Sequence, residues 1–258
     1  MKDIMKEEKP LVSILLPVYK SEKYLEESIK SLLSQSYKNI EIVAVADYLK
    51  DDSLKILRQF RKKDKRLRIY KNVQTYGLAV TLNRAVKKTN GDFIAFMDTH
   101  GTSTRQRIAK QVSFLQKNPK IAAVGTQTII LNEDGKRVEK SNFPLEHESI
   151  YKRIIDSSSL KFETVMISKK ALPKDILKFT KDKYPYLYAD VFLKIAMYKE
   201  IANLNFYLNT TRINTKNKAF IRMDKSLSLL KLLLKSSTQY DYKHRSGRAP
   251  DSAHVSVS

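Results

Sequence analysis

The alternation of short apolar runs with amphipathic stretches is the strongest constraint on how this chain folds. Four apolar runs, each long enough for a strand buried on both faces, occupy residues 11–19, 39–46, 66–70 and 92–97. The stretches between them repeat apolar side chains at helical spacing, and in the first stretch these are Leu25, Ile29 and Leu32. Strands that alternate with helices predict an α/β fold with a Rossmann-like, mostly parallel sheet flanked by helices.

The pattern continues less regularly beyond the fourth run. We expect a helix around 108–115, a strand over 121–131, a turn at 133–136 with Gly135 in the left-handed conformation, a short strand at 165–168 and a helix over 189–200. These elements predict one domain over 10–215. An amphipathic C-terminal helix is expected within 216–240, either packed on the core or lying on a membrane surface, followed by a disordered tail at 241–258.

The net charge of the chain limits the classes of partner that we expect it to bind. It carries 49 Lys and Arg against 27 Asp and Glu, a net charge of +22, which favours an anionic partner. The charge is scattered and no aromatic RNA-binding signature or zinc-ligand spacing occurs, so specific nucleic-acid binding is not expected. Cysteine is absent, as is any apolar run of the roughly 18 residues that a spanning helix needs. We therefore expect a cytoplasmic protein, with peripheral contact to anionic lipid at the inner face of the membrane.

Single acids follow two of the apolar runs. Asp47 and Asp98 stand at predicted strand ends, where doubly wound sheets bind their ligands. In "DTHG", Asp98 is a candidate ligand for a divalent cation that also holds a diphosphate, and His100 would suit Mn²⁺ better than Mg²⁺. The alternatives are that Asp98 caps a turn and that His100 is an ordinary loop residue. Asp47 either contacts a nucleotide base or ribose or caps the next helix.

Several segments, taken together and in order, resemble the GT-A glycosyltransferases of family 2. They are "VSILLPVYKSEKYLEESIKSLLSQSYKNIEIV", "YGLAVTLNRAV", "GDFIAFMD" and "RIAKQVSFLQKNPKIAAVGT", within residues 10–155. The resemblance implies a GT-A fold, a divalent metal (Mn²⁺ or Mg²⁺) and a nucleotide-diphospho-sugar donor. It also implies that the donor and its metal are bound by Pro17, Val18, Tyr19, Asp47, Asp98 and Arg107, with His100 at the second metal position.

The chain departs from the family pattern at three places. Ala46 replaces the first of two acids after the second strand, and His100 replaces the second carboxylate of the acidic motif. Leu187 and Tyr188 stand where the family has its Glu-Asp pair, whose aspartate is the usual catalytic base. Asp190 is the nearest remaining acid, and the resemblance therefore implies Asp190 as the candidate base.

Two main interpretations of the function follow, and a third is less favoured. The first is an enzyme that transfers a sugar, with inversion, to a glycan or lipid-linked acceptor in cell-envelope polysaccharide or glycolipid biosynthesis. The second is a degenerate, catalytically weak or inactive GT-A domain that binds a nucleotide or a partner. The third is a basic nucleic-acid-binding protein, whose affinity would fall steeply with salt.

Overall fold

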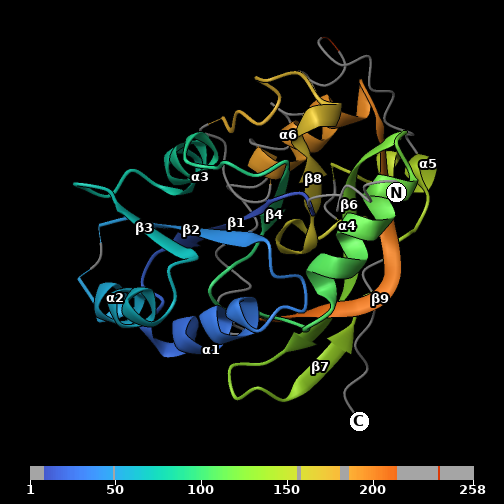
Figure 1. Cartoon of the computed structure of the whole chain (residues 1–258). Helices are drawn as coiled ribbons and strands as arrows, with labels where there is room; N and C mark the ends of the chain where they lie inside the picture. Colours follow the sequence, from blue (N-terminus) through green and yellow to red (C-terminus); the bar gives the residue numbers. More distant parts are fainter. Residues whose placement is uncertain (1–8, 49, 156–157, 181–185, 214–237, 239–258) are drawn as a thin grey trace, which may run out of the picture.

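Four parallel strands form the first half of the sheet in the computed structural model, which describes residues 9–48, 50–155, 158–180, 186–213 and 238. The spatial order is β3-β2-β1-β4, and the strands are β1 (Val12–Val18), β2 (Ile40–Ala46), β3 (Leu67–Lys71) and β4 (Phe93–Phe96). Helices α1 (Glu22–Leu33) and α2 (Ser53–Lys63) lie on one face of the strands, and α3 (Leu78–Lys87) lies on the other (Figure 1).

These strands are apolar at nearly every position because both faces of the sheet are covered. In β1, Ile14 packs in one apolar cluster with side chains of α1 and α2, whereas Leu15 packs in another with side chains of α3. Successive side chains of a strand point to opposite faces. Because both faces are covered by helices, every residue of β2 is buried.

The second half of the sheet is mixed in direction. It continues as β4-β8-β6-β9-β5, with β7 paired to β6. The short β8 (Met166–Ser168) runs antiparallel to both β4 and β6 (Ile121–Leu131), whereas β9 (Glu200–Arg212) runs parallel to β6. Two further short strands are β5 (Thr102–Ser103), antiparallel to β9, and β7 (Arg137–Lys140), antiparallel to β6.

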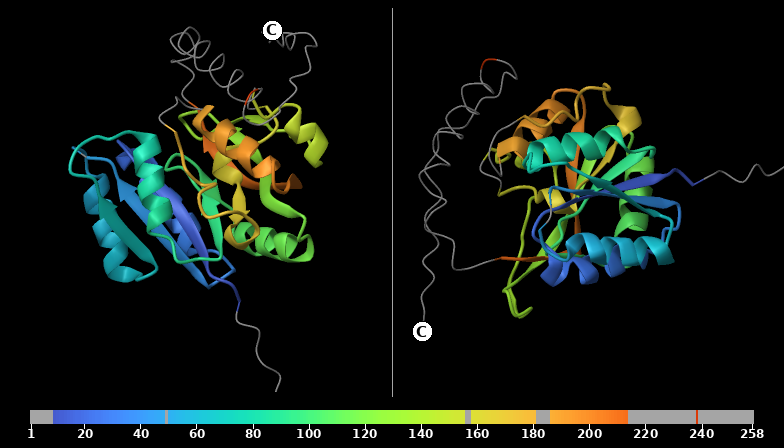
Figure 2. Two further views of the ribbon diagram at one scale, coloured as in Figure 1. Left: turned by 90° about the horizontal axis from the view of Figure 1, so that it is seen from above. Right: turned by 90° about the vertical axis from the view of Figure 1, so that its left-hand side faces the viewer.

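Among the described residues, three helices and two 3-10 turns complete the second half. Figure 2 shows the same ribbon from two further sides. They are α4 (Arg107–Lys117), α5 (His147–Tyr151), η1 (Phe162–Thr164), η2 (Lys169–Ala171) and α6 (Tyr186–Ala196). None of the described helices combines the length and the apolar composition that crossing a bilayer requires.

The fold class predicted from the sequence is confirmed, and so is the left-handed Gly135, whose φ is 81°. The helix expected over 189–200 was misplaced: α6 ends at Ala196, and Glu200 already begins β9, a long strand that the sequence did not predict. Asparagine and threonine residues interrupt the apolar pattern of β9. The buried Asn203, for example, donates to the carbonyls of Pro144 and Ser159 at 2.7 and 2.8 Å. The helix predicted within 216–240 and the tail 241–258 lie outside the described residues, apart from position 238.

Candidate active site

A cavity of about 520 Å³ lies at the carboxyl ends of β1, β2 and β4. Its wall includes part of η1 and of α6, so both halves of the sheet contribute to it. The cavity brings together most of the residues predicted from the sequence: Pro17, Val18, Tyr19, Asp47, Asp98 and His100. The other two predicted residues, Arg107 and Asp190, are absent from its lining.

Asp47 is a buried acceptor for the loop between β3 and α3. Its Oδ1 accepts hydrogen bonds from Asn72 Nδ2 at 2.8 Å and from the amide of Tyr76 at 2.9 Å. Its Oδ2 accepts from the amide of Gly77 at 2.8 Å. The side chain therefore shapes the cavity wall by fixing this loop, and its predicted contact with a nucleotide base or ribose stays a prediction.

Asp98 organises the tight turn that follows β4. Its Oδ1 accepts from the amides of His100 at 2.8 Å and Gly101 at 2.7 Å, and its Oδ2 makes only a long contact of 3.4 Å with Thr211 Oγ1. Gly101 is required by packing, since a Cβ there would stand 2.2 Å from the carbonyl oxygen of Thr210 on β9. The turn-capping role considered for Asp98 is thus present, and one carboxylate oxygen stays available to a ligand.

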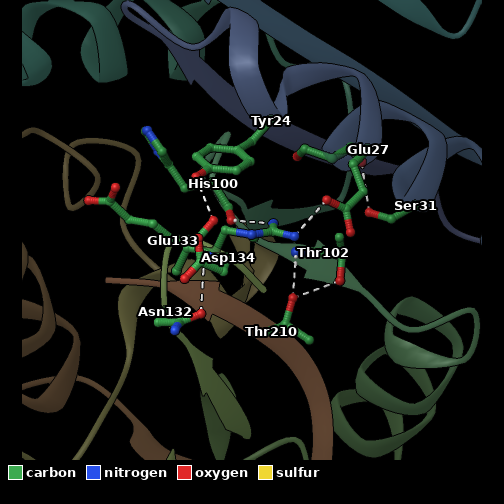
Figure 3. A network of polar contacts seen from close by, with 12 residues as sticks. Tyr24, Glu27, Ser31, His100, Thr102, Asn132, Glu133, Asp134 and Thr210 are labelled. Atoms are coloured by element: carbon green, nitrogen blue, oxygen red, sulfur yellow. Dashed lines mark hydrogen bonds and ion pairs between the residues drawn. The ribbon is translucent and has the colours of Figure 1, made fainter. Parts of the chain in front are cut away.

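His100 lies between this cavity and a smaller one of about 260 Å³. Its ring packs near that of Tyr24, with centroids 5.8 Å apart, and its carbonyl accepts from Arg212 Nη1 at 3.0 Å. Arg212 also donates from Nη2 to Glu27 at 2.8 Å (Figure 3). Lys20 and Arg212 both line the smaller cavity, so cationic side chains stand beside the exposed edge of the Asp98 turn.

The donor set near Asp98 fits a divalent cation only with help from a ligand. The described residues contain no group of three or more His, Cys, Asp or Glu side chains placed to hold a metal ion. Asp98 Oδ2 and the His100 imidazole are the two donors that the sequence analysis predicted for this edge of the cavity. A mixed oxygen and nitrogen pair suits Mn²⁺ better than Mg²⁺. The remaining ligands would have to be diphosphate oxygens and water.

Arg107 is placed behind the cavity rather than in it. It is fully buried at the start of α4 and donates to the carbonyl of Phe96 at 2.8 Å and to Gln111 Oε1 at 3.1 Å. Burial lowers the pKa of its guanidinium to about 9, although the nearby charges of Glu163 and Asp98 oppose that shift. From this position Arg107 holds the end of β4, the strand that precedes Asp98. A direct contact between Arg107 and the sugar donor, which the resemblance implied, is therefore not supported.

Asp190 is likewise withdrawn from the cavity. It is fully buried on α6, and its Oδ2 accepts from Lys194 Nζ at 2.5 Å. From the same helix, Tyr188 does line the cavity, with its ring stacked on Phe162 at a centroid distance of 3.4 Å. An acid paired with lysine and outside the cavity lining does not fit the catalytic role implied for Asp190.

Glu163 is an acidic wall residue that the sequence analysis missed. It belongs to η1, lines the cavity, and has a pKa raised by burial, with the neighbouring charge of Asp98 adding to the shift. Because β8 pairs antiparallel with β4, with Ala95 opposite Met166, Glu163, which precedes β8, and Asp98, which follows β4, lie at the same edge of the sheet. An acid before a strand reaches this edge only if the strand is antiparallel, and the sequence did not show the direction of β8.

Curated glycosyltransferases are similar to this chain in sequence. The putative teichuronic acid biosynthesis glycosyltransferase TuaG of Bacillus subtilis is 30% identical over 132 residues, which cover 51% of this chain and 52% of TuaG. Across TuaG and three other curated glycosyltransferases, the chain spans between 46% and 68% of the relative's length.

Solved structures share the fold at low identity. The mannosyltransferase PcManGT from Pyrobaculum calidifontis, in complex with GDP-Man and Mn²⁺, matches with a TM-score of 0.69 at 17% identity, over 94% of this chain and 66% of PcManGT. Residues 1–349 of S. aureus TarS, in complex with UDP-GlcNAc, match with a TM-score of 0.71 at 19% identity, over 90% of this chain and 68% of that one. The family model for glycosyl transferase family 2 matches residues 13–178, and the chain belongs to that family.

Proposed function

We propose that this chain transfers a sugar from a nucleotide-diphosphate donor to a hydroxyl group of a glycan or lipid-linked acceptor, with inversion at the anomeric carbon. The observation that carries the proposal is the cavity at the carboxyl ends of β1, β2 and β4, where Pro17 to Tyr19 form one wall and the Asp98 turn forms another. Solved proteins of the same fold hold GDP-Man with Mn²⁺ or UDP-GlcNAc, which supports a nucleotide-sugar donor here.

The charges around the cavity suit a diphosphate. Asp98 Oδ2 and the His100 imidazole would hold a divalent cation, which supplies positive charge against the negative charge that develops on the leaving diphosphate. Lys20 and Arg212 stand at the neighbouring cavity that shares His100 and would add to this positive field. The Asp47 hydrogen bonds hold the loop that closes the other side, so the nucleoside wall is preorganised.

The acceptor is proposed to belong to the cell envelope. Support comes from TuaG, whose name places it in teichuronic acid biosynthesis, and from the net charge of +22, which favours approach to an anionic membrane surface at its cytoplasmic face. A sedimentation assay with vesicles of anionic and neutral lipid tests the membrane part. Binding to both vesicle types alike, or to neither, would contradict it.

The second candidate is a domain that binds a nucleotide without turnover. It is favoured by the withdrawal of Asp190, which is paired with Lys194 outside the cavity, and by His100 in place of a carboxylate. Such a module would bind a nucleotide with or without metal and would release no nucleotide from a donor sugar.

Isothermal titration with UDP and with GDP, in the presence and absence of Mn²⁺, tests the proposal. The decisive variant is Asp98→Asn, which keeps an acceptor for the turn amides but removes the charge, and Asp52→Asn is the matched control because Asp52 is exposed at the start of α2. Binding that needs Mn²⁺ and is lost only in Asp98→Asn supports the proposal. Absence of nucleotide binding by the wild type would refute it.

A further inference from the structure

Sugar transfer to a hydroxyl group requires an acceptor for the hydroxyl proton, and a carboxylate is a common choice. The acids that line the cavity are Asp47, Asp98 and Glu163. Both oxygens of Asp47 accept hydrogen bonds from the chain, and one oxygen of Asp98 holds two backbone amides. Glu163 differs from these two acids, because the contacts of its carboxylate are with its own segment, Lys161 included, and not with a distant loop of the cavity wall.

The position of Glu163 suits a proton acceptor. It lies across the cavity edge from Asp98 because η1 leads directly into β8, which pairs antiparallel with β4. Its side chain is 13% exposed, and its Oε2 is sealed from solvent with no hydrogen-bond donor, at 3.7 Å from Lys161 Nζ. Glu163 lines the cavity, so its carboxyl group stands where a bound acceptor could reach it.

The surroundings keep this carboxyl group apart from bulk water. Phe162 and Tyr188 stack beside it at a centroid distance of 3.4 Å. The charged groups that face it are Lys161 from its own segment, Asp98 beyond β4, and the buried Arg107 of α4. Burial raises the pKa of Glu163, and a carboxylate of raised pKa is a stronger base near neutral pH.

We propose that Glu163 is the general base of the transfer reaction, with its carboxylate taking the proton of the acceptor hydroxyl. This inference rests on the proposed function. The acceptor oxygen forms a bond to the anomeric carbon, the bond from that carbon to the diphosphate oxygen breaks, and its electron pair leaves with the nucleoside diphosphate. The proton remains on Glu163 and passes to solvent after the products leave. Glu163 would then take the role that Asp190, buried against Lys194, does not fit.

Water can serve as the acceptor in a test, so the natural acceptor need not be known. The assay measures UDP or GDP released from a panel of UDP-sugars and GDP-sugars, including UDP-GlcNAc and GDP-Man, and titrates UDP and GDP in parallel. Glu163→Gln is expected to lower the rate of nucleotide release about 100- to 10,000-fold, with the Kd for nucleotide changed less than about threefold. The exposed Glu139→Gln on β7 is the matched control and is expected to match the wild type.

A purely structural Glu163, serving only as counter-ion to Lys161 and Arg107, predicts a different outcome. Formate added to Glu163→Ala is expected to restore part of the release rate if a base is missing, whereas it would restore nothing if only packing were lost. Should Glu163→Gln fail to fold, Glu163→Asp keeps the charge and withdraws the carboxylate by one methylene. That variant is expected to bind nucleotide with the Kd of the wild type and to cleave nucleotide from the donor sugar more slowly.

The outcomes separate this inference from the proposed function. Glu163→Gln or Glu163→Asp with wild-type release rates would overturn Glu163 as the base and leave the glycosyltransferase proposal standing. A wild type that binds nucleotide but releases none from any donor would overturn the base and favour the binding module. A wild type that binds no nucleotide would refute the proposed function itself.

Discussion

Replacing Asp47 with alanine is a direct test of how the cavity is built. Asp47 is 4% exposed and accepts hydrogen bonds from Asn72, Tyr76 and Gly77. The variant removes all three acceptor contacts at once and releases the loop that forms one wall of the cavity. It should therefore lower both the free energy of unfolding and the affinity for nucleotide.

The size of the stability loss can be worked from the fate of each donor. A hydrogen bond to a charged group contributes about 1.5–3 kcal/mol, and a buried donor left without a partner costs about 1–3 kcal/mol. The Asn72 amide keeps a second acceptor in Thr81 Oγ1 at 3.1 Å. The amides of Tyr76 and Gly77 belong to exposed residues that water can reach. Because all three donors keep a partner in Thr81 or water, each loss should be about 1 kcal/mol, and Asp47→Ala should lose about 3 kcal/mol in total.

Urea unfolding followed by circular dichroism measures this loss. With a denaturant slope of about 3 kcal/mol per molar, the midpoint should fall by about 1 M. Asp52→Ala is the matched control, because that side chain is 67% exposed and makes only an ion pair of 3.5 Å with Lys55, which is worth less than about 1 kcal/mol. A midpoint for Asp47→Ala equal to that of the control would refute the reasoning.

Three further predictions concern the framework of the site. Gly101→Ala places a Cβ 2.2 Å from the Thr210 carbonyl oxygen, so it should cost about 1–3 kcal/mol and weaken nucleotide binding measured by calorimetry; unchanged binding would contradict the packed turn. Arg107→Met removes the hydrogen bonds from a buried guanidinium to the carbonyl of Phe96 and to Gln111 Oε1, and should lower the free energy of unfolding by about 3 kcal/mol in urea titration; a neutral effect would contradict a supporting role. Although burial opposes the shift, hydrogen bonds from Ser13, Asn90 and Arg68 lower the pKa of Glu41 below its usual value of 4.5. Its stabilising contribution is therefore present above that value and lost as pH falls through the folded pKa. Glu41→Gln should thus be about 2 kcal/mol less stable than the wild type near pH 7, with the difference shrinking as the pH falls through the lowered pKa of Glu41. A difference that does not change with pH would refute this assignment.

Local patterns in the sequence determined the first half of the molecule. Each strand of β1 to β4 is a nearly unbroken apolar run because helices cover both faces, and each intervening helix repeats apolar residues at its own period. Because those strands are parallel, the acids that follow them had to reach one edge of the sheet. The convergence of Asp47 and Asp98 on one cavity was therefore predictable without coordinates.

Only the tertiary structure decided how the second half of the sheet runs and which charged side chains reach the cavity. Both depend on strand direction and on the surroundings of each side chain. The antiparallel course of β8 carries Glu163 to the cavity, and no local pattern in "KFETVMIS" encodes that direction. Burial in the interior placed Arg107 against the carbonyl of Phe96 and Asp190 against Lys194, although the family resemblance implied that both would act in the cavity. Long-range hydrogen bonds allowed the polar β9 to enter the sheet. Sequence periodicity reports which face of an element is buried, whereas contacts between distant segments decide which charged side chains meet a ligand.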